Sequence, residues 1–113
     1  PEEAEQHDYD VAEEKFKAGN YKGAVANFTK AAAAELATSG ITCNCICPGY
    51  FYTDLTRETL DSDFFQANAK TMIPEERYGN PGELDTAAIF LSSKESAYVT
   101  GVILPVDGGY TCM

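Results

Sequence analysis

The stretch Ile41–Thr53 has the sequence I-T-C-N-C-I-C-P-G-Y-F-Y-T. Along Ile41–Cys47 the side chains alternate between two faces, as they do in a β strand. The Pro48-Gly49 pair predicts the end of that strand, because proline cannot donate to a strand ladder and glycine turns freely. We therefore expect a strand over Ile41–Cys47 and a loop over Pro48–Thr53.

Helical patterns precede this strand. An acidic helix is predicted over residues 2–18 and an alanine-rich helix over residues 21–38. The Gly19-Asn20 pair between them is typical of a helix end and a turn. Residues at the spacing of a buried helix face in the second helix are Ala24, Val25, Phe28, Ala31, Ala32 and Leu36. The chain should thus begin with a helical hairpin.

Further helices and a second strand follow. Residues 54–72 predict two short helices, the second capped by Ser62 or Asp63. A third helix is expected to start near Pro81, because proline is favoured in the first turn of a helix. Residues 102–106 form a second apolar strand pattern, followed by a turn.

Strands separated by helices are typical of a parallel α/β sheet. We predict an α/β fold that is mostly helical, with a short two-stranded parallel sheet. With 113 residues the chain is expected to form a single domain, 1–113. Within it, residues 1–38 would form the hairpin and residues 39–113 a β-α-β segment.

Charge and hydropathy limit the partners. The formal net charge is −10, and an acidic surface repels phosphate, so neither nucleic acid nor an anionic membrane is an expected partner. No stretch approaches the ~20 apolar residues that span a bilayer. The acidic start of the chain is unlike a signal peptide, which begins with basic residues.

Three cysteines, Cys43, Cys45 and Cys47, fall on one face of the predicted strand. Neighbours on one strand face are poorly placed for a disulfide, and zinc sites usually present C-x-x-C at a turn. We expect small buried thiols, an exposed Cys112 and no metal site. Free thiols fit a reducing, cytoplasmic compartment.

Several motifs from Tyr21 onward occur in an order that resembles the C-terminal part of the short-chain dehydrogenase/reductase family, over residues 21–113. Within that family, the sequence of this segment is similar to gluconate and related sugar-alcohol dehydrogenases. The motifs are Lys22-Gly23-Ala24, Asn44-x-Ile46-x-Pro48-Gly49-x-x-x-Thr53, Arg77-x-Gly79-x-Pro81-x-Glu83, Phe90-Leu91-x-Ser93, Tyr98-x-x-Gly101 and Val106-Asp107-Gly108-Gly109.

The resemblance implies site residues and a cofactor. Lys22 would be the catalytic lysine of the family and would also contact the cofactor. Pro48, Gly49 and Thr53 would belong to the loop that lies over the nicotinamide. The resemblance also implies that the sheet is part of a Rossmann-like fold, and that the cofactor is NAD or NADP.

The chain departs from the family pattern at the proton-transfer site. Family members carry a tyrosine four residues before the lysine, where an ammonium lowers the phenol pKa. Here that position is Ala18, and Tyr21 points about 100° around a helix from Lys22. The glycine-rich phosphate-binding turn, the first βαβ unit and the serine strand of the family are also absent from these residues. We therefore expect no cofactor to bind the isolated chain.

The N-terminal residues resemble a different family. Over residues 5–38 the pattern is similar to a tetratricopeptide repeat, a helix, a Gly-x-Tyr turn and a second helix. The matching positions are Gly19, Tyr21, Ala24, Phe28 and Ala31. Because residues 21–31 satisfy both resemblances, a chimera joined through the shared helix is one hypothesis, and chance similarity of a helical hairpin is the other.

Three functional hypotheses follow. In the first, the chain is catalytically silent and acts as a folded scaffold or interaction module. In the second, it is part of an NAD(P)-dependent oxidoreductase for a sugar, alcohol or carbonyl substrate and needs the missing N-terminal half. In the third, the hairpin binds a protein or peptide, although such repeats usually need about three copies. The exposed edges of a two-stranded sheet also predict self-association into a dimer or larger assembly.

Overall fold

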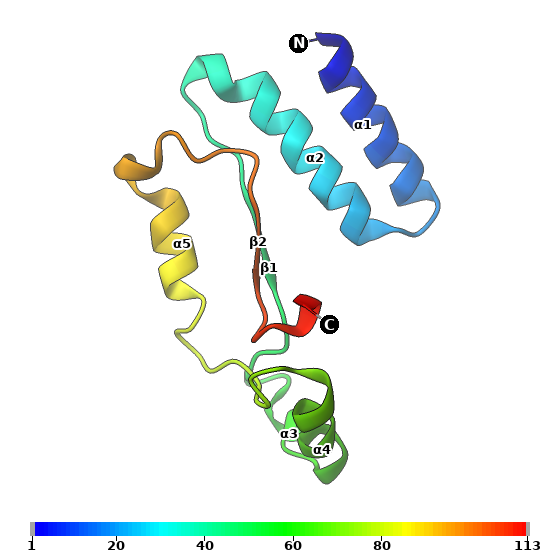
Figure 1. The fold of residues 1–113 in the computed structure, drawn as a ribbon, viewed down its shortest axis with the longest axis vertical. Coiled ribbons are helices and arrows are strands. Elements are labelled where there is room, and N and C mark those ends of the chain that lie inside the picture. Colours follow the sequence, from blue (N-terminus) through cyan, green and yellow to red (C-terminus); the bar gives the residue numbers. More distant parts are fainter. Residues whose placement is uncertain (1, 113) are drawn as a thin grey trace. The chain divides into compact units, whose positions relative to one another are not determined.

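The computed structural model describes residues 2–112 and confirms a mostly helical α/β fold with a two-stranded parallel sheet (Figure 1). The elements, in chain order, are α1 (Glu2–Lys17), α2 (Tyr21–Leu36), η1 (Ala37–Ser39), β1 (Cys45–Pro48), α3 (Arg57–Leu60), α4 (Asp63–Met72), α5 (Asp85–Ser92), η2 (Lys94–Ser96), β2 (Ile103–Val106) and η3 (Tyr110–Cys112).

The chain divides into two compact units. The first runs up to Cys45 and takes in Phe90–Leu104, and the second contains Ile46–Ile89 and the chain from Pro105 onward. Each strand therefore contributes residues to both units. The expected single domain with a division after residue 38 stays a prediction.

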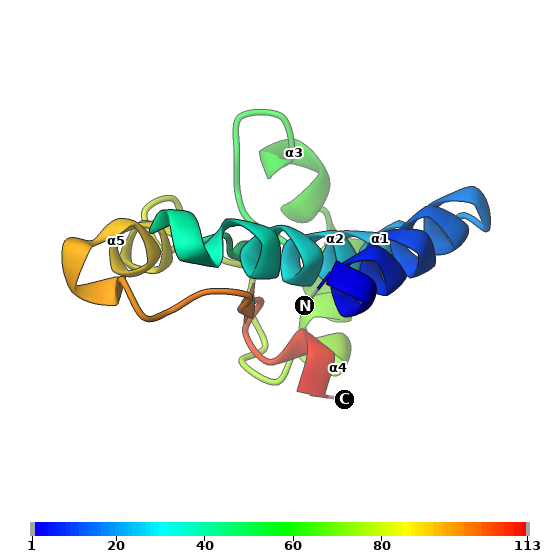
Figure 2. The same ribbon diagram turned by 90° about the horizontal axis from the view of Figure 1, so that it is seen from above.

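In the first unit, α1 and α2 form the expected hairpin and lie side by side (Figures 1 and 2). Gly19 adopts φ 83°, the left-handed conformation that glycine accepts without a Cβ penalty. The Asn20 N–H donates to the Lys15 carbonyl at 2.8 Å and the Gly19 N–H to the Phe16 carbonyl at 3.0 Å. These two bonds form a Schellman cap, which ends α1 at Lys17.

Small side chains form the buried surface of the hairpin. Ala12 and Ala31 are fully buried and Ala24 is 1% exposed. The expected burial of Val25 and Phe28 is wrong, because these side chains are 47% and 43% exposed. The two helices pack closely through alanines, so larger side chains remain at the edge of the contact.

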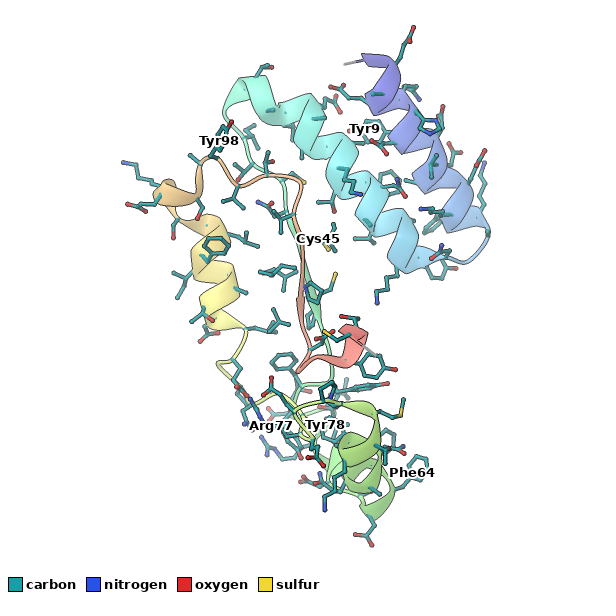
Figure 3. The ribbon with its side chains drawn as sticks, viewed as in Figure 1. Tyr9, Cys45, Phe64, Arg77, Tyr78 and Tyr98 are labelled. Atoms are coloured by element: carbon teal, nitrogen blue, oxygen red, sulfur yellow. The ribbon has the colours of Figure 1, made fainter. Side chains whose placement is uncertain are left out.

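Hydrogen bonds between polar side chains also link α1 to α2. The Lys15 ammonium donates to Asn27 Oδ1 at 2.7 Å, and Asn27 Nδ2 donates to Asp8 Oδ1 at 3.2 Å. The Tyr9 hydroxyl, which lies between α1 and α2 in Figure 3, donates to the Glu35 carboxylate. That hydrogen bond, together with burial, raises the pKa of Tyr9 to about 12.

The first strand is displaced toward the C-terminus relative to the prediction. It was expected over Ile41–Cys47, but the regular ladder covers only Cys45–Pro48. Before it, the Asn44 side chain replaces ladder bonds: Nδ2 donates to the Val99 carbonyl at 3.0 Å, and Oδ1 accepts from the Val102 N–H at 3.0 Å. A side chain that makes both bonds takes the place of regular backbone pairing.

The second unit contains its own small core. Leu60, Ala69, Ile73 and Tyr78 are buried together and are packed between α3, α4 and the loop that follows. The Ser62 hydroxyl accepts from the Phe65 N–H at 3.4 Å, so the predicted Ser62 cap is confirmed.

The helix expected to start near Pro81 starts instead at Asp85. Gly82 adopts φ 94°, which no residue of an α-helix can have, so residues 81–84 form turns. The thiols also differ from expectation: Cys43, Cys45 and Cys47 are only partly buried, whereas Cys112 is exposed as predicted.

The N-terminal cap of α2 gives a testable prediction. Asn20 Oδ1 accepts from the Gly23 N–H at 3.0 Å and thereby satisfies one of the free donors of the first helical turn. Replacing Asn20 by alanine should lower the free energy of unfolding by about 1 kcal/mol. Asn20→Asp keeps the oxygen and is the control. Urea unfolding followed by circular dichroism measures both, and equal stability of the two variants would contradict the assignment.

Candidate functional site

The loop Pro48–Thr53 leaves the end of β1 and is held closely at its start. The Gly49 N–H donates to the Val106 carbonyl at 2.9 Å. A Cβ atom at position 49 would lie 2.7 Å from Asp107 Cβ and 2.8 Å from Asp107 Cα. Such distances are shorter than any van der Waals contact between carbon atoms, so only glycine fits here.

The middle of the loop is held by a second segment. The Tyr52 N–H donates to the Gly79 carbonyl at 2.9 Å, and the Gly79 N–H donates to the Tyr50 carbonyl at 2.8 Å. The Phe51 ring covers Gly79 so closely that a Cβ atom there would lie 2.5 Å from the ring. Glycine therefore fits at this position without displacing the ring. Phe51 and Gly79 form a parallel bridge, which fixes the path of the loop.

Thr53 ends the loop and directs it into a helical turn. The Thr53 N–H donates to Thr56 Oγ1 at 2.9 Å, and the Thr56 N–H donates back to Thr53 Oγ1 at 3.1 Å. Thr56 Oγ1 in turn donates to the Phe51 carbonyl at 2.7 Å. The Thr53 side chain is exposed, so its oxygen retains access to solvent while it supports the turn before α3.

Asp107 accepts the hydrogen bonds that hold the turn after β2, beside the loop. The sequence predicted a turn here but not this role of the side chain. Its Oδ1 atom accepts from the Gly109 N–H at 3.0 Å. Its Oδ2 atom accepts from the Thr111 N–H at 3.1 Å and from the Thr111 hydroxyl at 2.8 Å. The Gly108-Gly109 pair after an aspartate is the signal that could have indicated this arrangement.

An ion pair borders the same region. Arg77 donates to both carboxylate oxygens of Glu83, at 2.7 and 2.9 Å, and to Glu75 at 3.0 Å. Glu83 also accepts from the Asn80 N–H at 2.8 Å. The hydrogen bonds from Arg77 lower the pKa of Glu83 to about 2, and the same pairing raises the pKa of Arg77.

Three tyrosine rings pack against one another in the same part of the chain. Tyr78 makes edge-to-face contacts with Tyr50 and Tyr52, in each case with ring centroids 5.9 Å apart. Its hydroxyl donates to the Phe65 carbonyl, and burial raises the pKa of Tyr78. Figure 3 shows Arg77 and Tyr78 in the part of the chain next to α3 and α4.

Between these groups lies a cavity of about 90 Å³. Pockets that hold small molecules and cofactors usually measure about 300–1,000 Å³. This cavity is therefore too small to hold a dinucleotide, and the loop can form only one wall of such a site. Its lining residues are Tyr50, Phe51, Glu75, Arg77, Tyr78, Gly79, Glu83, Val106, Asp107 and Gly108.

Lys22 belongs to the first unit, whereas Pro48, Gly49 and Thr53 belong to the second. Lys22 is exposed in the first turn of α2. Ala18 lies in the turn before α2, so it does not share a helix with Lys22. The i, i+4 relation that would put a residue at position 18 beside Lys22 requires a continuous helix, and here the helix is interrupted.

Between residues 2 and 112, no group of three or more His, Cys, Asp or Glu side chains is arranged to hold a metal ion. No helix in this part of the chain is long and apolar enough to cross a membrane.

A family model described as enoyl-(acyl carrier protein) reductase matches residues 10–111, which is most of the chain. The chain belongs to the short-chain dehydrogenase/reductase family. The predicted resemblance over residues 21–113 is thereby confirmed at the level of the family. The resemblance of residues 5–38 to a tetratricopeptide repeat, and the chimera hypothesis, stay predictions.

Curated and solved members of the short-chain dehydrogenase/reductase family are similar to this chain. Galactitol 2-dehydrogenase (L-tagatose-forming) of Cereibacter sphaeroides is 44% identical over 90 residues, which are 80% of this chain and 35% of that protein. A putative gluconate dehydrogenase from Agrobacterium tumefaciens is 43% identical, with a TM-score of 0.75, over 82% of this chain and 37% of that one.

A third relative was solved with a cofactor. The gluconate 5-dehydrogenase from Burkholderia cenocepacia, in complex with NADP and tartrate, is 43% identical to this chain with a TM-score of 0.74. The similarity covers 82% of this chain and 36% of the dehydrogenase. The present chain thus spans little more than a third of the length of these relatives.

The Arg77–Glu83 pair predicts a pH dependence of stability. A carboxylate whose pKa falls from 4.5 to about 2 on folding stabilises the folded state above pH 4.5, and this stabilisation is lost as the pH falls from 4.5 toward 2. Glu83→Gln should therefore show a smaller loss of unfolding free energy between pH 7 and pH 3 than the unmodified chain. Because both side chains are partly exposed, screening by salt should reduce the difference.

Glu58→Gln is the matched control, because it removes the same charge from α3, outside this ion pair. Urea unfolding at the two pH values, at low and at high salt, provides the comparison. If Glu83→Gln and the unmodified chain lose the same unfolding free energy between pH 7 and pH 3, the ion pair does not stabilise the folded state as predicted.

Proposed function

We propose that these residues form the C-terminal part of an NAD(P)-dependent oxidoreductase that acts on a sugar, alcohol or carbonyl substrate. The observation that supports this most is the loop Pro48–Thr53. It packs on Asp107 and hydrogen-bonds to Val106 at Gly49, and it pairs with Gly79 at Phe51. The chain is 43% identical to a dehydrogenase solved with NADP. A loop fixed in advance loses little conformational entropy when it contacts a cofactor.

The proposed contacts are those that the resemblance implies. Pro48, Gly49 and Thr53 would form the wall next to the nicotinamide, and the Lys22 ammonium would act near the reacting proton. The nicotinamide, when bound, supplies the hydride chemistry. The chain itself contributes a rigid wall that excludes water, and a positive charge that lowers the pKa of a neighbouring phenol.

Two groups must come from residues outside this sequence. The cavity of about 90 Å³ cannot enclose a dinucleotide, so the phosphate-binding part of the site must be supplied elsewhere. Ala18 carries no titratable proton, so the proton donor of the family must also come from elsewhere. A catalytically silent scaffold is the second candidate, and the interrupted helix between Ala18 and Lys22 favours it.

A fusion tests the proposal. The gluconate 5-dehydrogenase from Burkholderia cenocepacia would supply its chain up to the residue before its own lysine, and residues 22–113 of this chain would follow. The fusion restores a tyrosine four residues before Lys22 on one helix. We expect it to bind NADPH and to turn over the substrate of the parent dehydrogenase, measured as the change in NADPH absorbance.

Two lysine variants of the fusion separate catalysis from folding. Lys22→Met should lower turnover by about 100-fold or more, the usual range for a group that assists proton transfer. Lys30→Met removes another exposed lysine of α2 and should retain turnover. A folded fusion that neither binds NADPH nor reacts would refute the oxidoreductase proposal and favour the scaffold.

We also propose that the chain self-associates, because a sheet of two strands has outer edges that another copy can pair with. Sedimentation velocity over a range of concentrations should show a dimer or a larger species. A monodisperse monomer at high concentration would contradict this proposal.

A further inference from the structure

Asp107 lies directly against the start of the loop Pro48–Thr53, and its side chain is extensively hydrogen-bonded. Its carboxylate accepts three hydrogen bonds, one from the Gly109 N–H and two from the backbone and side chain of Thr111. Hydrogen bonds to an ionised carboxylate are among the stronger ones in proteins. They tie residue 107 to residues two and four positions further along the chain.

The turn that Asp107 holds is also seated on a second segment. The Glu75 N–H donates to the Gly108 carbonyl at 3.1 Å. A Cβ atom on Gly108 would lie 2.9 Å from Ile73 Cγ2, and one on Gly109 would lie 3.0 Å from Pro74 Cγ. The turn therefore lies so close to Ile73 and Pro74 that a side chain at either glycine would be crowded against them.

The opposite side of Asp107 supports the loop. Its Cα and Cβ atoms lie where a side chain of residue 49 would be, so the backbone of Gly49 rests directly on them. Gly49 also hydrogen-bonds to Val106, the residue before Asp107. The position of Gly49 is thus determined by Asp107, which is itself held between the loop and Ile73–Glu75.

From this geometry we propose that Asp107 is the positioning residue for the proposed cofactor loop. The proposed role of its carboxylate is to hold the turn against which Gly49 packs, through the bonds to Gly109 and Thr111. The proposal rests on the proposed function of the loop. It is separable from that function, because the position of the loop can be measured without a cofactor.

The variants are chosen to remove bonds one group at a time. Asp107→Asn keeps one oxygen, but the amide nitrogen that replaces Oδ2 cannot accept from the Thr111 donors. Thr111→Val removes only the hydroxyl bond and has nearly the same shape, and Thr111→Ser retains a hydroxyl as the matched control.

Hydrogen exchange of the 113-residue chain gives the first readout. The amides of Gly49, Tyr52 and Thr53 report on the loop, and those of Asp61 and Gln66, which bond to Arg57 and Ser62 away from the turn, are the reference. Asp107→Asn should exchange about tenfold faster at Gly49, with little change at the reference amides, because two hydrogen bonds are lost locally. Unchanged exchange at Gly49, or an equal increase at the reference amides, would overturn the proposal.

If Asp107→Asn fails to fold, the two Thr111 variants test whether the bonded turn holds the loop. Thr111→Val should then exchange faster at Gly49 than Thr111→Ser. Equal rates in the two variants would overturn the proposal.

NADPH titration of the same chain, followed by nucleotide fluorescence, gives the second readout. If the unmodified chain binds NADPH, Asp107→Asn should weaken the affinity by about tenfold. Unchanged affinity would overturn the link between Asp107 and the cofactor. If the unmodified chain binds no NADPH, a cofactor site in the isolated chain is refuted, and the exchange measurement still decides whether Asp107 positions the loop.

Discussion

The close approach of Gly49 to Asp107 is the constraint on which the site-bearing unit depends. Because Gly49 has no side chain, its backbone can rest on Asp107 while its N–H bonds to Val106. This contact joins residues that are far apart in the sequence. The remaining loop contacts, from Phe51 to Gly79 and from Thr53 to Thr56, follow from where Gly49 directs the chain.

Glycines also determine the helix ends in the first unit. Gly19 and Gly40 both adopt left-handed conformations, and each ends a helical segment with paired backbone bonds. The turn at Gly19 has a chemical consequence, because it separates Ala18 from the helix that carries Lys22. A tyrosine at position 18 alone would not stand beside Lys22 on a continuous helix, as the family arrangement requires.

Local patterns in the sequence predicted much of this structure, and contacts between distant residues account for what they missed. The hairpin, the cap at Ser62 and the end of the first strand at Pro48-Gly49 follow from local residue patterns, and the family follows from the resemblance of several motifs. The exposure of Val25 and Phe28 could not be predicted, because helical periodicity identifies an apolar face without showing how much of it a partner covers.

The same limit applies to the candidate site. The seating of Gly49 on Asp107 depends on a contact between distant residues rather than on propensity. The left-handed Gly82 delays α5 through a local turn, which the proline at position 81 does not indicate. Lys22, Pro48, Gly49 and Thr53 were identified by resemblance, and their roles stay predictions. The supporting residue Asp107 has no pattern of its own beyond the glycines that follow it.

The most direct measurement is a crystal structure of the fusion, which joins the N-terminal part of the Burkholderia cenocepacia dehydrogenase to residues 22–113, with NADPH bound. The account predicts that the nicotinamide lies against Pro48-Gly49 and that Asp107 keeps its contact with Gly49. NADPH bound away from this loop, or a correctly folded fusion in which Gly49 has separated from Asp107, would contradict the account.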